Sequence, residues 1–177
     1  MKIARISLIA ILLTALASVA LSGSKNEPEK EKKPPEETKK EIVWLSYDIA
    51  LKKAKTEEKH IFIDFTAAWC GYCKKMDRET FSDQRVIDIL NNDFVPVKVD
   101  GESSKELDID GYKITERNLA IREFGVRGYP TFWFLKSDGS KLAPIGGYRT
   151  TEYMLEALTY VKDYKYQDST STEGGKQ

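Results

Sequence analysis

One stretch of the chain joins an apolar run, a short turn and two closely spaced cysteines. Residues 61–65 are rich in residues that favour β-structure and predict a buried strand. Two residues separate Cys70 from Cys73, and the lysine-rich amphipathic sequence that follows predicts a helix. This order puts Cys70 at the start of a helix and Cys73 one turn further on, on the same side.

The position of Cys70 matters because the thiolate is the reactive form of cysteine. Unpaired backbone N–H groups and the positive end of the helix dipole stabilise an anion at a helix start. We therefore expect the pKa of the Cys70 thiol to be lowered. Cys73 is close enough to form a disulfide with Cys70, and such a pair can exchange two electrons with another disulfide.

Other uses of a cysteine pair fit the sequence less well. A purely structural disulfide across so short a loop would remove little entropy from the unfolded chain. A structural zinc site needs about four ligands, whereas the chain has two Cys and one His, His60. Covalent haem attachment needs a His directly after the second Cys, where this chain has Lys74. We interpret the pair as redox-active and expect no metal and no other cofactor.

Three segments resemble the thioredoxin superfamily. Residues 64–74 are similar to its active-site segment, and residues 124–132 resemble the loop that carries its cis-proline. Within that loop, the sequence Arg-Gly-Tyr-Pro-Thr is close to that of protein disulfide isomerase domains. Residues 79–86 resemble the C-terminal domain of the bacterial thiol:disulfide interchange protein and related periplasmic thioredoxins. The resemblance covers about residues 45–162.

This resemblance implies an α/β fold of the thioredoxin type, a single domain with a central mixed β-sheet and helices on both faces. It implies an enzyme, a thiol:disulfide oxidoreductase, in which Cys70 is the more exposed cysteine and attacks a substrate disulfide. Cys73 then resolves the mixed disulfide. We expect the protein to work as a reductase. Use as an oxidase or isomerase, and a module that hands over Cu(I), remain as alternatives.

Asp64 is predicted to be a third catalytic residue. Burying an Asp in an apolar strand is costly unless the group is paired or used. Thioredoxins carry a buried acid at this position, six residues before the first cysteine, and the resemblance implies that Asp64 accepts the proton of Cys73 through water. Burial would raise its pKa. Thioredoxins usually place a lysine nearby on the next strand; the matching position is Pro96, so only Lys98 could substitute.

The remaining predicted site residues concern substrate binding. Trp69, Gly71 and Tyr72 are expected to surround Cys70 with an apolar rim. Pro130, as a cis-proline, leaves neighbouring backbone free to pair with an extended peptide. Tyr129, just before it, is expected to lie against Cys70 and to influence which substrates fit.

The ends of the chain are predicted to lie outside the domain. Residues 1–21 have positive charges before an apolar run and predict a signal peptide cleaved near Ala20, with an uncleaved membrane anchor as the alternative. Residues 22–41 predict a charged flexible linker, residues 42–163 the thioredoxin-like domain, and residues 164–177 a disordered tail. Export would place the protein in a bacterial periplasm or at the outer cell face.

Composition bears on the partners. Lys plus Arg and Asp plus Glu number 28 each, so the net charge favours no nucleic-acid partner. We expect protein substrates with disulfides or thiols, a membrane protein as electron donor, and a monomer.

Three architectural expectations complete the prediction. Residues 94–99 form a continuous apolar run, which predicts a central strand covered on both faces. Residues 101–113 are polar and acidic, and we expect a surface insertion near the active site. Ile49 and Ile121 are expected on the apolar sides of two helices, one starting near Tyr47 and one near Thr115.

Overall fold

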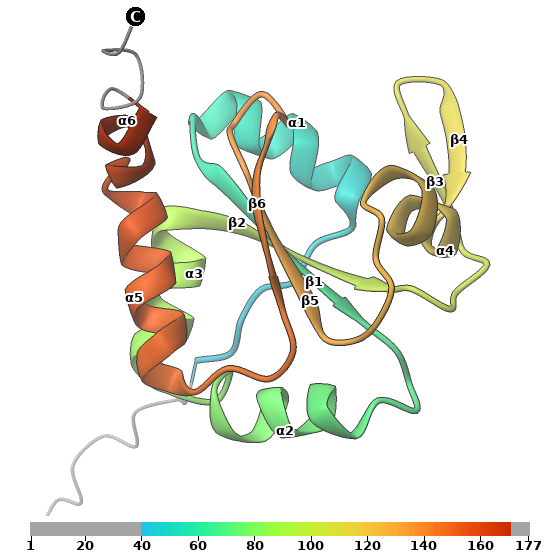
Figure 1. Ribbon diagram of the computed structural model, residues 1–177. Helices are drawn as coiled ribbons and strands as arrows, with labels where there is room; N and C mark the ends of the chain where they lie inside the picture. The colour runs from blue at the N-terminus through green and yellow to red at the C-terminus, as the bar shows by residue number, and fades with distance from the viewer. Residues whose placement is uncertain (1–39, 171–177) are drawn as a thin grey trace, which may run out of the picture. The chain divides into compact units, whose positions relative to one another are not determined.

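The computed structural model describes residues 40–170 (Figure 1). The predicted signal peptide, nearly all of the predicted linker and the last seven residues lie outside this range. None of the helices within it is long and apolar enough to cross a bilayer.

Strand β1 (His60–Thr66) contains the apolar run and is buried along nearly its whole length. It pairs in parallel with β2 (Phe94–Asp100) and antiparallel with β5 (Thr131–Leu135), and β6 (Lys141–Gly146) lies antiparallel beside β5. The resulting mixed sheet has the order β2-β1-β5-β6. The predicted α/β architecture is confirmed.

The side chains of β1 alternate between two core clusters. Ile61, Ile63 and Phe65 face a cluster formed with α1 (Tyr47–Glu57) and the π-helical turn η1 (Leu119–Glu123), which follows α4 (Glu116–Asn118). Phe62 faces a second cluster with α2 (Gly71–Glu79), α3 (Gln84–Asp93) and α5 (Thr151–Lys162). Helices therefore cover both faces of the sheet, as predicted (Figure 1).

The prediction that residues 94–99 form a central strand is wrong, because β2 is an edge of the four-stranded sheet. Within residues 40–170, one isolated parallel bridge, between Leu45 and Val97, extends the sheet beyond it. The strand is nevertheless buried, since both core clusters include its side chains. The sequence of β2 is continuously apolar because core clusters cover both of its faces, although the strand lies at the edge of the sheet.

Residues 101–113 are not a simple polar surface insertion. Strands β3 (Glu106–Ile109) and β4 (Tyr112–Thr115) form an antiparallel hairpin. Asp110 and Gly111 both have positive φ at its turn, which suits the twist of a two-residue hairpin loop. Leu107 and Ile114 are buried in the same cluster as α1, so the hairpin completes one core.

Two isoleucines predicted to face inward are exposed, Ile49 and Ile121. In α1 the inward stripe is narrow and consists mainly of Ala50 and Ala54. Ile121 lies in η1, whose wider π-helical turn changes the α-helical spacing of side chains on which the prediction relied.

The predicted disordered tail from residue 164 begins too early. Residues Lys165–Thr170 form helix α6. The Tyr166 hydroxyl lies 2.9 Å from Nε2 of the buried His60, and the Tyr164 ring lies 4.7 Å from the His60 ring. Aromatic contacts with the start of β1 therefore hold a segment whose polar composition suggested disorder.

Candidate active site

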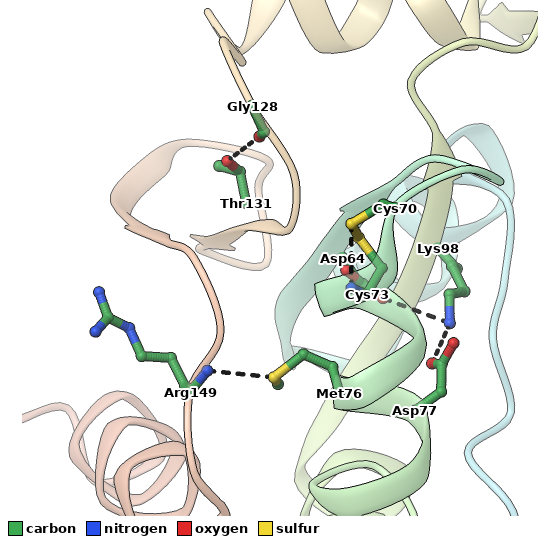
Figure 2. Close-up of a disulfide and its surroundings, with 9 residues drawn as sticks. All are labelled: Asp64, Cys70, Cys73, Met76, Asp77, Lys98, Gly128, Thr131 and Arg149. Atoms are coloured by element: carbon green, nitrogen blue, oxygen red, sulfur yellow. Dashed lines mark hydrogen bonds and ion pairs between the residues drawn. A yellow bond between two sulfur atoms is a disulfide. The ribbon is translucent and has the colours of Figure 1, made fainter.

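Cys70 and Cys73 form a disulfide at the start of α2. Cys70 is the N-cap residue, and its Sγ accepts a hydrogen bond of 3.1 Å from the backbone N–H of Cys73 (Figure 2). A Cys70 thiolate would keep that donor and lie at the positive end of the helix dipole. Both effects favour the anion, which is the reactive form of cysteine.

The expected difference in exposure between the cysteines is absent from this disulfide-bonded form, in which both are 4% exposed. They pack with Ala67 and against Tyr129. The neighbouring aromatic residues are open to solvent instead, with Trp69 70% and Tyr72 64% exposed. Gly71, the first residue of α2, has open space where a side chain would project.

Asp64 extends its side chain from β1 into the interior, on the side of the sheet covered by α2. It is 2% exposed, and its Oδ2 lies 3.5 Å from Nζ of Lys98, which is also 2.6 Å from Oδ1 of Asp77 on α2 (Figure 2). Asp77 follows Cys73 by four residues, hence on the same face of the helix. The carboxyl group of Asp64 therefore lies beneath the helical turn that carries Cys73.

Burial raises the pKa of Asp64 to about 7. The positive charge of Lys98 opposes this shift, and the negative charge of Asp77 adds to it. The other oxygen of Asp64, Oδ1, has no hydrogen-bond partner within residues 40–170. The group can therefore change protonation state near neutral pH.

Lys98 supplies the lysine near Asp64 that the matching position, Pro96, does not provide. The register pairs Asp64 directly with Lys98, and paired residues of adjacent strands project to the same face. Trp44 supports the lysine, with its ring centre 5.1 Å from Nζ. The sequence prediction missed Asp77, although its spacing of four from Cys73 is a signal that could have identified it.

Tyr129 packs beside the two cysteines, and the peptide bond between Tyr129 and Pro130 is cis. The Tyr129 ring packs against the cysteines and makes an edge contact with Trp69, at 5.9 Å between ring centres. On its other side a Cβ at Gly101 would overlap the Tyr129 hydroxyl, so this glycine makes room for the ring.

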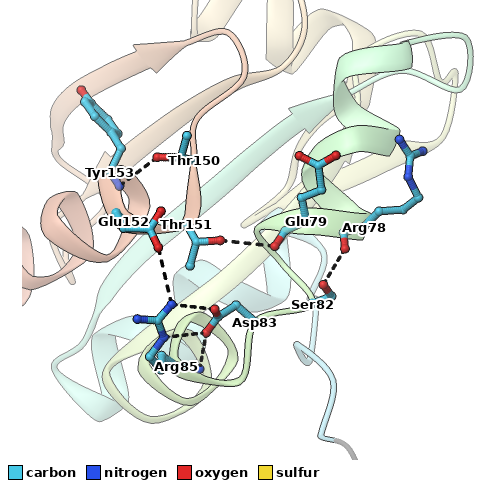
Figure 3. Close-up of polar contacts among 9 residues, drawn as sticks. All are labelled: Arg78, Glu79, Ser82, Asp83, Arg85, Thr150, Thr151, Glu152 and Tyr153. Atoms are coloured by element: carbon cyan, nitrogen blue, oxygen red, sulfur yellow. Dashed lines mark hydrogen bonds and ion pairs between the residues drawn. The ribbon is translucent and has the colours of Figure 1, made fainter.

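The segment between β6 and α5 also reaches the site, which the sequence analysis did not predict. The Gly147 N–H donates to the carbonyl of Pro130 at 2.8 Å, and the Arg149 N–H lies 3.3 Å from Sδ of Met76. Figure 3 shows the start of α5 tied to α2 and α3: Thr151 Oγ1 donates to the Glu79 carbonyl, and Arg85 pairs with Glu152.

Comparison with known proteins agrees with this geometry. The sequence matches the family model of the thioredoxin-like domain over residues 47–162, about two thirds of the chain. The chain belongs to the thioredoxin-like family.

Two curated relatives illustrate the match of this thioredoxin-like protein. The thiol:disulfide interchange protein DsbD of Campylobacter jejuni is 32% identical over 120 residues, covering 64% of this chain and 19% of that protein. The protein disulfide-isomerase of Medicago sativa is 30% identical over 145 residues, covering 81% and 25% respectively. The chain thus spans between 19% and 25% of the length of these relatives.

One solved structure is matched over a larger share of its own length than these two relatives are. The solution structure of a putative disulphide-isomerase from Bacteroides thetaiotaomicron is 31% identical, with a TM-score of 0.53, and the match covers 68% of this chain and 92% of that one. The thioredoxin-like domain thus accounts for nearly the whole of that structure.

Proposed function

We propose that this thioredoxin-like protein is an exported thiol:disulfide oxidoreductase that reduces disulfides in other proteins. The observation that carries the proposal is the Cys70–Cys73 disulfide at a helix N-terminus, with the buried Asp64 beneath the turn of Cys73. The names of the relatives, a thiol:disulfide interchange protein and a protein disulfide-isomerase, support the same chemistry.

The reaction begins from the reduced pair. The Cys70 thiolate attacks one sulfur of the substrate disulfide, forming a mixed disulfide and releasing one substrate thiolate. Asp64, through water, takes the proton of Cys73, whose thiolate attacks the Cys70 sulfur and releases the second substrate thiolate. The released thiolates take up protons, the substrate gains two electrons, and Cys70–Cys73 ends as the disulfide. A dithiol of a partner protein must return those two electrons.

The pKa of Asp64 suits this residue to accept the proton of Cys73. With a pKa of about 7, the carboxylate is available at neutral pH and is still basic enough to take a thiol proton. Its Oδ1, which has no partner within the described residues, is the free acceptor.

The direction of electron flow depends on how strongly the reduced form, with its Cys70 thiolate, is stabilised. A strong oxidant owes its potential to a stabilised reduced form. In the disulfide-bonded form the Cys70 sulfur accepts a hydrogen bond from the Cys73 backbone N–H, and no Lys, Arg or His within residues 40–170 donates to it. This modest stabilisation at a helix start supports the proposed role as a reductase.

Substrate binding is assigned to the surface around the disulfide. The cis Pro130 and Tyr129 hold an extended segment of the substrate as a short β-addition. The exposed side chains of Trp69 and Tyr72, with Gly71 between the cysteines, form the apolar rim. A membrane protein is the proposed source of electrons, and the protein acts as a monomer.

The reduction potential of the cysteine pair tests the proposal. The protein is equilibrated against glutathione or dithiothreitol buffers, and the fluorescence change from Trp69 reports the fraction reduced. We expect a potential of about −270 mV. A value of about −180 to −120 mV would indicate an oxidase or isomerase. The Cys70→Ser protein is the control and should show no redox-dependent change in fluorescence.

A further inference from the structure

Tyr148 lies beside the site but has no part in the exchange reaction itself. It follows Gly147, whose positive φ and hydrogen bond to Pro130 direct this segment toward the disulfide. The ring of Tyr148 is tilted against that of Tyr72, with 6.5 Å between ring centres. Tyr72 is the residue between Gly71 and Cys73, so Tyr148 extends the apolar rim.

Two charged side chains of α2 hold the Tyr148 ring in place. Its hydroxyl donates a hydrogen bond of 2.7 Å to Oε2 of Glu79. Nζ of Lys75 lies 4.3 Å from the ring centre and 3.8 Å from the same Glu79 oxygen. A cation over an aromatic face attracts it. The ring is therefore fixed before a substrate arrives, which reduces the entropy lost when a ligand packs against it.

The rim thus consists of two aromatic pairs that extend from the disulfide in different directions. Trp69 pairs with Tyr129, whose hydroxyl reaches Gly101 beyond the end of β2. Tyr72 pairs with Tyr148, which is anchored further along α2 at Glu79. An extended peptide with its cysteine at the disulfide would place its flanking residues toward different pairs.

We propose that Tyr72 and Tyr148 form a subsite for one bulky apolar side chain flanking the substrate cysteine, and that Tyr148 is a specificity-determining residue. The inference rests on the proposed disulfide exchange with protein substrates and adds a preference to it. The preferred substrate segment carries an aromatic or large aliphatic residue on one defined side of its cysteine.

Three disulfide-linked peptide dimers test the subsite. One has Phe two residues before the cysteine, one has Phe two residues after it, and the third has Ala at both positions. The rate constant for reduction of each dimer by the reduced full-length protein is measured. We expect Tyr148→Ala to lower the rate with one Phe peptide, relative to the Ala peptide, by about threefold to tenfold. The preference for the other Phe peptide should persist.

Control variants separate this effect from a general disturbance. Tyr112→Ala removes an exposed tyrosine on β4 and should leave all three rates unchanged. Tyr148→Phe keeps the ring and should keep most of the preference. An equal loss with all three peptides in Tyr148→Ala would overturn the inference, because it would indicate only a structural role. Failure of the unmodified protein to reduce any dimer would instead contradict the proposed function, and this inference with it.

A second variant keeps the test decisive if Tyr148→Ala folds poorly, since Tyr148 also packs against the second core cluster. Tyr72 is largely exposed, so Tyr72→Ala does not depend on core packing. It should lose the preference for the same Phe peptide. Loss of the preference for the other Phe peptide in Tyr72→Ala would overturn the inference.

Discussion

Lys98 contacts two carboxyl groups with different surroundings, those of Asp64 and Asp77. These contacts affect the pKa of Asp64. The Lys98 ammonium lies 2.6 Å from the half-exposed Asp77 but 3.5 Å from the buried Asp64. The negative charge of Asp77 partly offsets the attraction between Lys98 and Asp64. Burial consequently dominates at Asp64, and its pKa is raised to about 7. A fully paired Asp64 would ionise at lower pH and would be a weaker base for Cys73.

The raised pKa of Asp64 predicts how stability depends on pH. The folded protein binds this proton up to about pH 7, whereas the unfolded chain releases it near pH 3.8, so stability falls as pH rises through this window. Asp64→Asn removes the cost of burying the charge. We expect it to be more stable than the unmodified oxidised protein at pH 8, by about 2–4 kcal/mol, and to differ little at pH 4.

Urea unfolding at the two pH values measures this difference. Asp93→Asn, at the end of α3, is the matched control and should show no comparable change with pH. Equal effects of Asp64→Asn at pH 4 and pH 8 would contradict the assignment of the titration to Asp64.

Asp77 should influence the pKa of Asp64, because both carboxyl groups pair with Lys98. In Asp77→Asn the negative charge is lost and Lys98 is free to pair more closely with Asp64, so the pKa of Asp64 should fall. NMR titration of the Asp64 carboxyl carbon in the oxidised protein measures the shift. Asp88→Asn, which removes an exposed carboxylate on α3 that pairs with Lys40, should leave the titration unchanged. A rise in the pKa would show that Lys98 does not mediate the coupling.

Among the elements, the β3–β4 hairpin differs most from its prediction. Its acidic residues are exposed, but Leu107 and Ile114 contribute to the core that also holds α1 and Val99 of β2. Lys52 of α1 and Asp110 at the hairpin turn form an ion pair across the contact, at 3.5 Å. The hairpin is therefore part of the structural core rather than a removable surface addition.

Leu107→Ala tests this role of the hairpin. Truncating a fully buried leucine leaves a cavity, and we expect a loss of about 2–5 kcal/mol in the free energy of unfolding. Lys113→Ala on β4 removes only an exposed ion pair with Glu106 and should cost little. Thermal or urea unfolding compares the two variants. A similar small loss in both would mean that the hairpin does not contribute to folding stability.

At the scale of the whole molecule, the family match leaves the residues before 47 and after 162 outside it. The match to the thioredoxin-like family begins at residue 47 and ends at residue 162, inside the predicted domain of residues 42–163. We propose that residues 1–21 direct export and that residues 22–41 act as a linker between this segment and the domain.

Expression in a Gram-negative bacterium tests export. We expect the periplasmic fraction to contain a chain that starts near residue 21, because the small residues around Ala20 suit signal-peptide cleavage. N-terminal sequencing and intact mass identify the start. A Lys2→Glu, Arg5→Glu variant, with the positive end of the leader reversed, should be exported less. Recovery of a full-length chain in the membrane fraction would support the uncleaved anchor instead.

Features formed by neighbouring residues could be predicted from the sequence pattern. The apolar run, the two-residue spacing of the cysteines and the helix after them are neighbours in the chain, so periodicity and capping chemistry were sufficient to predict β1 and the start of α2. The resemblance indicated Tyr129, which packs beside the cysteines, and the cis peptide bond before Pro130. The Asp110-Gly111 turn was not predicted, although an Asp-Gly pair is typical of a two-residue hairpin loop.

Features that depend on distant segments became visible in the three-dimensional fold. The edge position of β2, the packing of α6 on His60 and the burial of the hairpin depend on contacts between residues far apart in the sequence. The same holds for the site: strand register brings Lys98 to Asp64, and the loop before α5 brings Tyr148 to Tyr72. Local pattern carries no information on these pairs, because they meet only once the sheet and helices have assembled.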